Sequence, residues 1–370
     1  MTINIPHIKG VTAKQAHVGI PDGTYEEEYA RNGFFGGYAH LYRTEPPTAW
    51  TRIEGALRPR AFAPRELADG DFLACRRPYL FNEDCRIHFF AQSRAMPYHF
   101  RNADMDEVYF IHEGTGRLET DFGPVRYETG DYILVPRGTV YRFEPAQPTK
   151  LLLVESAGEY RFPDKGMLGE HALFDPSVIR VPTPEKTGPS TPVPGKEWEL
   201  KIQRRGVISS VFYPFDPVNV VGWKGTLCVM QLNVRDIRPV SCDRYHLPPS
   251  AHTTFLGHNF VICSFLPRPL ENGDPEAMKV PFYHSNIDFD EVLFYHAGQF
   301  FSREGIGPGM MTFHPQGIHH GPQPKAVERT QNVRETQEVA VMIDTRKPLE
   351  VGPAALPSEI GDYWTSWQKK

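Results

Sequence analysis

The sequence has little cysteine, no excess of positive charge and no long apolar run. Its five cysteines form no Cys-x-x-Cys pair, which indicates reduced thiols rather than a disulfide framework. A formal net charge of -5 argues against nucleic acid as a partner. The apolar runs, such as residues 151–154, are too short to span a membrane, and the N-terminus lacks the apolar core of a targeting segment. We therefore expect a cytoplasmic protein that binds neither nucleic acid nor a membrane.

Proline and glycine are plentiful instead, with 35 and 31 residues, and aromatic residues make up 12% of the chain. Runs typical of strands, such as residues 86–92, 107–112 and 131–136, are broken by Gly, Asp and Pro. Short strands separated by frequent turns favour a sandwich or a barrel over long helices. The composition therefore predicts an all-β-dominated fold with few short helices.

Two patterns occur twice in the same order. Residues 106–114, DEVYFIHEG, correspond to residues 290–298, DEVLFYHAG, at an offset of 184 positions. Residues 130–141 follow the pattern Gly-x5-Pro-x-Gly-x2-Tyr, and residues 309–320 repeat it with His in the last place, at an offset of 179 positions. Duplicated units fix an architecture. Both patterns resemble the two motifs of a cupin barrel, so we predict a double cupin of two jelly-roll-like β-barrels.

The repeat divides the chain into three parts. Residues 1–180 are expected to form an N-terminal cupin barrel with a wrapping N-terminal segment and a degenerate metal site. Residues 181–200 are rich in Pro, Thr and Gly and are predicted to be an extended linker. Residues 201–370 are expected to form the catalytic barrel. Because exposed edge strands need covering, we expect a homo-oligomer.

The second copy of the motifs carries a set of metal-binding side chains. His284, Glu291 and His320 occupy the motif positions and offer two imidazoles and one carboxylate. Strand alternation excludes His296, and the spacing selects His320 over the adjacent His319. This donor set suits an open-sided Fe(II) site, with manganese as the second choice, whereas structural zinc requires four ligands.

His314 and the first barrel are considered separately as possible contributors to metal binding. His314 is predicted to lie just outside the metal ligands, with direct ligation and simple packing as alternatives. In the first barrel we assign the corresponding positions to His99, Arg101, Glu107 and Tyr141. A tyrosine replaces one histidine there, and an arginine would repel a cation. The first barrel is therefore expected to be structural.

Several segments resemble the homogentisate 1,2-dioxygenase family, chiefly between residues 210 and 325. They include PFDPVNVVGW at 214–223, HLPPS at 246–250, FVI at 260–262 and YHSN at 283–286. The resemblance implies that His246 is the active-site base and that His314 precedes the iron ligand His320. We assign Asn286, Tyr295 and Phe300 as substrate-binding candidates. The implied reaction is iron-dependent cleavage of a para-diphenol by O2, converting homogentisate to maleylacetoacetate in tyrosine and phenylalanine catabolism.

Three departures from the family bear on the substrate. Ser285 stands where the family has arginine, Glu291 comes one residue later, and Phe300 replaces a tyrosine that helps to hold the substrate carboxylate. Hydroquinone and gentisate therefore stay open as alternative substrates. A different class of function is a bicupin that binds metal without oxygenase activity, such as a storage protein or a sugar-phosphate isomerase.

Overall fold

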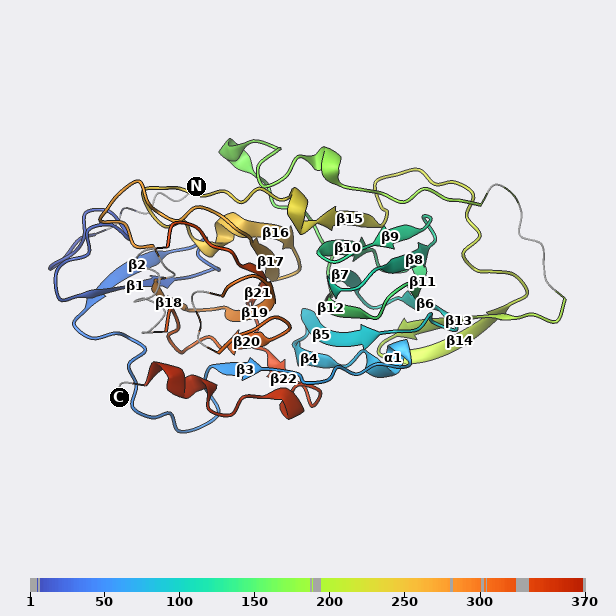
Figure 1. Cartoon of the computed structure of the whole chain (residues 1–370), viewed down its shortest axis with the longest axis horizontal. Helices are drawn as coiled ribbons and strands as arrows, with labels where there is room; N and C mark the ends of the chain where they lie inside the picture. Colours follow the sequence, from blue (N-terminus) through green and yellow to red (C-terminus); the bar gives the residue numbers. More distant parts are fainter. Residues whose placement is uncertain are drawn as a thin grey trace. The chain divides into compact units, whose positions relative to one another are not determined.

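β-strands make up nearly all the regular structure of this computed structural model, which describes residues 5, 7–186, 188, 194–279, 282–300, 303, 305–323 and 333–368 (Figure 1). Within these residues the single α-helix is α1 (Phe72–Cys75), capped by Asp71, which accepts a hydrogen bond from the Ala74 amide. The other helical turns are short 3-10 segments: η1 (Gly166–Leu168), η2 (Pro176–Val178), η3 (Val234–Asp236), η4 (Pro249–His252), η5 (Leu356–Ser358) and η6 (Tyr363–Trp367).

The first barrel is built from residues 65–237 and 350–355. One of its sheets has the order β15-β10-β7-β12-β5-β4-β22 and the other the order β14-β13-β6-β11-β8-β9. The sets β5-β12-β7-β10 and β6-β11-β8-β9 are the two facing sheets of a jelly roll. The strands are β4 (Pro78–Phe81), β5 (Cys85–Gln92), β6 (His99–Asn102), β7 (Asp106–Glu113), β8 (Gly116–Thr120), β9 (Val125–Tyr127), β10 (Asp131–Val135), β11 (Val140–Pro145), β12 (Thr149–Ser156), β13 (Trp198–Arg204), β14 (Val207–Tyr213), β15 (Met230–Asn233) and β22 (Glu350–Val351).

Aromatic side chains fill the space between these two sheets. Phe90, Phe100, Tyr109, Tyr141 and Phe143 come from five positions on four strands and are all fully buried in one cluster. Tyr141 and Phe143 lie two residues apart on β11, so the strand alternation points both inward. Burying each large side chain stabilises the fold by about 1.5–3 kcal/mol, so this cluster contributes substantially to the stability of the barrel.

The second barrel is built from the described residues within 1–64, 238–349 and 356–370. Its larger sheet has the order β16-β17-β21-β19-β20-β3, and its smaller sheet has the order β18-β1-β2. The strands are β1 (Tyr25–Ala30), β2 (Tyr38–Arg43), β3 (Arg60–Phe62), β16 (Thr253–Leu256), β17 (Phe260–Phe265), β18 (Tyr283–Asn286), β19 (Asp290–Ala297), β20 (Met311–His314) and β21 (Val339–Thr345).

The two barrels share one plan. The order β17-β21-β19-β20 in the second barrel matches β5-β12-β7-β10 in the first, strand for strand. The duplicated motifs occupy equivalent places, since Asp106–Glu113 is β7 and Asp290–Ala297 is β19. The motif glycines Gly114 and Gly298 both adopt a positive φ, of 102° and 91°. The predicted all-β fold with two jelly-roll-like cupin barrels is confirmed.

Each barrel is completed by strands from the other half of the sequence. The hairpin β1–β2 comes before the first barrel in the chain, yet β1 pairs in parallel with β18. The hairpin β13–β14 comes before the second barrel, yet β13 pairs in parallel with β6. In the same way β3 extends the sheet at β20, and β15 extends the sheet at β10. The two sequence repeats therefore exchange equivalent segments.

This exchange divides the chain differently from the linear scheme expected from the sequence. Residues before 65 belong with the second barrel, and residues 201–237 belong with the first. The reason is backbone pairing, because the strands in these segments complete sheets that their neighbours in sequence do not form. Of the linker predicted over residues 181–200, residues 187 and 189–193 lie outside the described residues.

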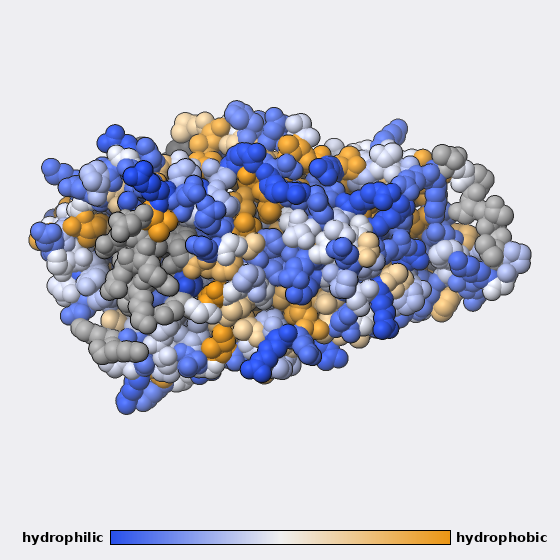
Figure 2. Space-filling view, viewed as in Figure 1, coloured by the Kyte–Doolittle hydropathy of each residue, from blue (hydrophilic) through white to orange (hydrophobic). Residues whose placement is uncertain are grey.

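No helix in the described part of the chain is both long and apolar enough to cross a membrane. On the face drawn in Figure 2, hydrophilic residues predominate and apolar ones form separate patches. The expected homo-oligomer stays a prediction.

The motif glycine Gly298 should be irreplaceable on steric grounds. A Cβ built at Gly298 would lie 1.7 Å from the carbonyl oxygen of Gln337, whereas at Gly317, with a similar φ of 88°, the nearest atom is 3.8 Å away. Gly298→Ala should therefore cost about 1–3 kcal/mol more than the control Gly317→Ala, which bears the backbone strain alone. Urea unfolding monitored by tryptophan fluorescence measures the difference. Equal losses for both variants would contradict the steric argument.

Candidate metal centre and the adjoining pocket

The second barrel brings its three predicted metal ligands together. His284 lies on β18, Glu291 lies on β19, and His320 follows β20. The backbones of His284 and His320 form an isolated antiparallel bridge with N–H to O distances of 3.0 and 3.1 Å. One donor atom from each of the three side chains lies within 4.8 Å of the other two, and all three residues are buried.

The imidazoles present unused nitrogens to this point. Nδ1 of His284 donates to the carbonyl oxygen of Phe282 at 2.8 Å, which leaves Nε2 with its lone pair. Nε2 of His284 lies 3.6 Å and Nε2 of His320 lies 3.4 Å from the same Glu291 oxygen, Oε2. Both nitrogens are buried and make no hydrogen bond to any described residue. Buried polar atoms normally have partners, so this arrangement fits a cation bound between them.

His314 forms a hydrogen bond with the carboxylate of Glu291. Its Nδ1 donates to Oε1 of Glu291 at 2.7 Å, and its Nε2 accepts from the Tyr363 hydroxyl at 3.2 Å. His314 is fully buried, and its ring stacks on that of His320 with centroids 5.0 Å apart. Both ring nitrogens are therefore occupied, which favours the predicted role just outside the ligands over direct ligation.

Electrostatics keeps the donors in the protonation states that bind metals. Burial lowers the pKa of His314 to about 3, against the opposing hydrogen bond to Glu291. Burial and the neighbouring His284 lower the pKa of His320 as well. Burial acts to raise the pKa of Glu291, but the surrounding imidazoles, His320 foremost, hold it well below its ordinary value. Neutral imidazoles beside an ionised carboxylate are the form that coordinates a cation.

A pocket opens beside this cluster. His284 and Glu291 form part of its wall, and the other lining residues are His246, Leu247, Pro249, His252, Phe265, Arg268, Phe282, Leu293, Arg303 and Glu338. Nδ1 of His246 lies 2.7 Å from Oε1 of Glu271. Burial lowers the pKa of His246, although Glu271 opposes the shift. The predicted base is thus a neutral imidazole whose Nδ1–H is held, so that Nε2 is the basic atom.

The pocket also carries positive charge. Arg268 and Arg303 both line it, and a carboxylate oxygen of Glu338 lies 4.0 Å from Nη1 of Arg268. Arg303 is buried, with Nη1 donating to the carbonyl oxygen of Gly321 at 2.7 Å. Burial raises the pKa of Glu338, although the two arginines oppose the shift. The two guanidinium groups can form charge-assisted hydrogen bonds with an anionic group on a bound molecule.

The three residues predicted to bind substrate lie elsewhere. Asn286, Tyr295 and Phe300 are absent from the described lining of the pocket. The side-chain oxygen of Asn286 accepts from the Gly33 amide at 3.3 Å. The Tyr295 hydroxyl contacts Thr312 at 3.1 Å, and the Tyr295 ring packs against that of Phe300. In the described structure these side chains make the contacts given above and do not line the pocket.

Sequence reasoning missed several residues that shape the site. Glu271 and Glu338 support His246 and Arg268, and the Tyr363 hydroxyl holds His314. None of the three belongs to a spaced motif, and each comes from a different part of the chain. For Tyr363 the one available signal is its place in the aromatic segment of residues 363–367.

In the first barrel, the assignment of His99 and Arg101 to the motif positions is wrong. Tyr141 pairs with Phe100, as His320 pairs with His284, so Phe100 takes the place of the first histidine. His99 faces the other way, with Nε2 3.4 Å from Asp216. A shift of one residue along a strand reverses the face, so Arg101 gives way to Asn102.

Asn102, Glu107 and Tyr141 do meet in the first barrel, around the guanidinium of Arg76. Arg76 forms ion pairs with Glu107 and Glu155, and its Nη1 lies 3.1 Å from the Tyr141 hydroxyl. The Asn102 amide donates to Glu107 at 3.0 Å and to Glu155 at 2.8 Å. A fixed guanidinium therefore occupies the place that the second barrel leaves for a cation, which explains the loss of metal ligands.

Comparisons with known proteins relate this chain to dioxygenases. The family described as "Homogentisate 1,2-dioxygenase N-terminal" matches residues 70–234. A protein of Saccharolobus solfataricus named "Putative dioxygenase" is 32% identical over 98% of this chain and 98% of its own length. Homogentisate 1,2-dioxygenases of Bradyrhizobium diazoefficiens and Rhodopseudomonas palustris are 27% and 26% identical over 74% and 76% of this chain. The matched part spans 64% and 66% of those two proteins, less than two thirds of each.

Among solved structures, a cupin 2 conserved barrel domain protein from Leptotrichia buccalis covers 72% of this chain and 86% of its own. Its identity of 10% and TM-score of 0.32 are too low to add to the argument from topology. The strand order and the buried cluster define a double cupin with a His2Glu constellation in one barrel. The chain belongs to the homogentisate 1,2-dioxygenase family.

Removing the guanidinium should destabilise the first barrel strongly. Arg76→Leu would leave Glu107 and Glu155, each about 1% exposed, without their cation. Breaking a buried ion pair in this way costs about 3–5 kcal/mol. The neighbouring Arg77 is exposed, so the control Arg77→Leu should change stability by less than about 0.5 kcal/mol. Urea denaturation measures both, and a loss of similar size in the two variants would contradict the role of Arg76.

Proposed function

We propose that this protein is an Fe(II)-dependent dioxygenase that cleaves the aromatic ring of a para-diphenol, with homogentisate as the first candidate substrate. His284, Glu291 and His320 would hold the iron. The observation that carries this proposal is the buried cluster of unpaired imidazole nitrogens and a carboxylate beside a pocket. Membership of the homogentisate 1,2-dioxygenase family supports the same reaction class. The products would be those of homogentisate cleavage in tyrosine and phenylalanine catabolism.

The three donors favour iron over a metal ion in a structural site, which would have four protein ligands. Two imidazoles and one carboxylate are the three protein ligands of oxygen-using Fe(II) sites, and three ligands leave positions open. When bound, such an iron activates O2 and the phenol together at those open positions. Glu291 also has its second oxygen held by His314, an arrangement typical of supported metal ligands.

His246 would take the phenol proton. Glu271 accepts the Nδ1–H of His246, so Nε2 is the atom available as a base. His246 lines the same pocket as His284 and Glu291, which supports its role as the base. A neutral imidazole is required for this step, and burial of His246 keeps it in that form by lowering its pKa.

The arginines of the pocket would select the ring substituent. Arg268 and Arg303 line the pocket together with Glu338, whose pKa is raised by burial, so a substrate acid group would have two guanidinium groups to pair with. This favours homogentisate and gentisate, which carry a carboxylate, over hydroquinone, which carries none. Homogentisate and gentisate differ in the distance between the carboxylate and the ring, and an activity assay distinguishes them as substrates.

The substrate test measures oxygen uptake by protein loaded anaerobically with Fe(II). Homogentisate should give the highest kcat/KM of the three diphenols, and gentisate should rank above hydroquinone because of its acid group. Uptake with hydroquinone alone would contradict the role of the arginines. Iron binding with no uptake on any diphenol would instead favour a bicupin that binds metal without oxygenase activity.

Each of the three ligands should be essential for iron binding. His284→Ala, Glu291→Ala and His320→Ala remove a donor each, and the remaining two cannot hold the ion tightly. We expect less than about a tenth of the oxygen uptake of the unmodified protein, together with loss of bound iron by elemental analysis. The exposed His258 lies in the same barrel, and the control His258→Ala should keep both. Retention of iron in all three ligand variants would refute the assignment.

The base should affect turnover but not iron. His246→Ala should retain its iron and lower kcat by about 100-fold or more, the usual contribution of a general base. Glu271→Gln should lower kcat by a smaller factor, because the imidazole stays while its orientation is less fixed. Steady-state oxygen uptake combined with iron analysis makes the comparison. Unchanged kcat in His246→Ala would exclude it as the base.

A further inference from the structure

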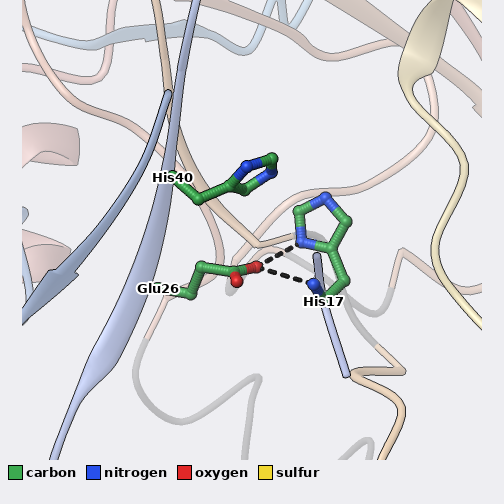
Figure 3. Close-up of side chains that lie close together, drawn as sticks. All are labelled: His17, Glu26 and His40. Atoms are coloured by element: carbon green, nitrogen blue, oxygen red, sulfur yellow. Dashed lines mark hydrogen bonds and ion pairs between the residues drawn. The ribbon is translucent and has the colours of Figure 1, made fainter. Parts of the chain in front are cut away.

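A second cluster of metal-binding side chains lies on the hairpin β1–β2. In this hairpin Glu26 pairs with Tyr42 and Glu28 pairs with His40, so these four side chains share one face. His17, from the segment that precedes β1, faces the same group (Figure 3). One donor atom each from His17, Glu26 and His40 lies within 4.8 Å of the other two. Two imidazoles and one carboxylate thus converge a second time, outside the centre described above.

The donors are buried and incompletely paired. His17 and Glu26 are only 5% and 2% exposed, and His40 is half-buried. Nδ1 of His17 lies 2.6 Å from Oε1 of Glu26, the contact drawn in Figure 3. This Nδ1 and Nε2 of His40 are buried nitrogens that make no well-formed hydrogen bond to a described residue. Buried polar atoms normally have a partner, so the unpaired Nε2 of His40 fits a cation bound in the cluster.

Two more residues support the cluster from outside. Oε2 of Glu28 lies 3.4 Å from Nε2 of His17, on the opposite side of the ring from the donor atom. The Tyr42 hydroxyl donates to Oε2 of Glu26 at 2.7 Å, and the His17 backbone N–H donates to Oε1 at 2.9 Å. Metal-ligating histidines and carboxylates characteristically have such supporting carboxylates and hydrogen bonds. His17 also adopts a φ of 65°, a strained conformation for a non-glycine residue.

We propose that His17, Glu26 and His40 form a second metal site, which takes a divalent transition-metal ion such as Zn²⁺. Imidazole nitrogen and carboxylate oxygen are normal zinc ligands, at about 2.0–2.2 Å, so the donors would need to close in slightly around an ion. Water can supply a fourth ligand because His40 is only half-buried.

A proton is the competitor for this site. Burial acts to lower the pKa of His17, but its contacts with Glu26 and Glu28 outweigh burial and raise the pKa to about 9. Without metal, an imidazolium between two carboxylates would satisfy part of the cluster. It would leave Nε2 of His40 without a partner among the described residues, which a metal ion would not.

The site would have a structural role in the second barrel. The His17 ring stacks on the Phe282 ring with centroids 4.0 Å apart, and Phe282 lines the pocket. The carbonyl oxygen of Phe282 also orients His284. An ion that fixes His17 would therefore stiffen one wall of the pocket and the candidate ligand His284.

The experiment counts Zn²⁺ in full-length protein that has first been stripped with a chelator. The double variant His284→Ala/His320→Ala removes the first centre, so one equivalent of Zn²⁺ should remain bound and should raise the unfolding temperature. Adding His40→Ala, at a half-buried position that tolerates truncation, should weaken this binding by at least about tenfold. Adding His171→Ala instead, at an exposed position in the other barrel, should change nothing.

The outcomes separate the two centres. If the double variant binds no Zn²⁺, or if His40→Ala leaves its affinity unchanged, the second site is refuted. Glu26→Gln in the same background provides a second test that keeps the size of the side chain, and it should also weaken binding. The test does not depend on the proposed dioxygenase function, because it is performed without the first centre.

Discussion

Each barrel buries a carboxylate at an equivalent position, and the negative charge of that carboxylate requires a nearby positive charge. Glu291 and Glu107 occupy equivalent places on β19 and β7, and both are almost completely buried. An isolated charge in such a site costs several kcal/mol, so each barrel requires a compensating positive group. In the first barrel the group is the guanidinium of Arg76. In the second barrel three imidazoles surround the carboxylate, and two of them keep a free lone pair for an ion.

The two solutions have opposite consequences for chemistry. A guanidinium is permanently charged and has no acceptor atom, so Arg76 satisfies the buried carboxylates of the first barrel without binding a metal ion. In the second barrel His284, Glu291 and His320 would hold the ion, and His284 and Glu291 line the pocket that also contains His246 and the two arginines. The exchange of segments gives the second barrel its N-terminal hairpin, whose strand β1 supports β18 and with it His284. The described residues before 65 thus belong to the second barrel.

Much of this arrangement could be predicted from spacing. The repeat at an offset of 184 residues located Glu291 and predicted two barrels, and the Pro-x-Gly turn selected His320 over His319. Applied to the first motif, the same offset makes Phe100 and Asn102 the equivalents of His284 and Asn286 in the first barrel. The sequence prediction instead assigned the position of His284 to His99, because His99 is a histidine. His99 lies one residue away from Phe100 and on the opposite face of the strand.

Other features depend on pairing between distant segments, which a local pattern does not contain. Arg76 and Glu271 act through charges that meet only in the folded barrel. The hairpin of Glu26 and His40 does alternate as strands do, but nothing local indicates that His17 joins it. The exchange of strands between repeats also left no signal, since each strand pairs with a partner more than 90 residues away.

The most direct test of the central claim is X-ray absorption at the iron edge of anaerobically loaded protein. The variant His40→Ala should be used, so that iron at the hairpin does not contribute. We predict a spectrum of an iron ion with two imidazole ligands and oxygen donors, and loss of the imidazole scattering in His284→Ala/His320→Ala. An iron environment without imidazole, or one unchanged by these substitutions, would contradict the assignment of the second barrel as the metal centre.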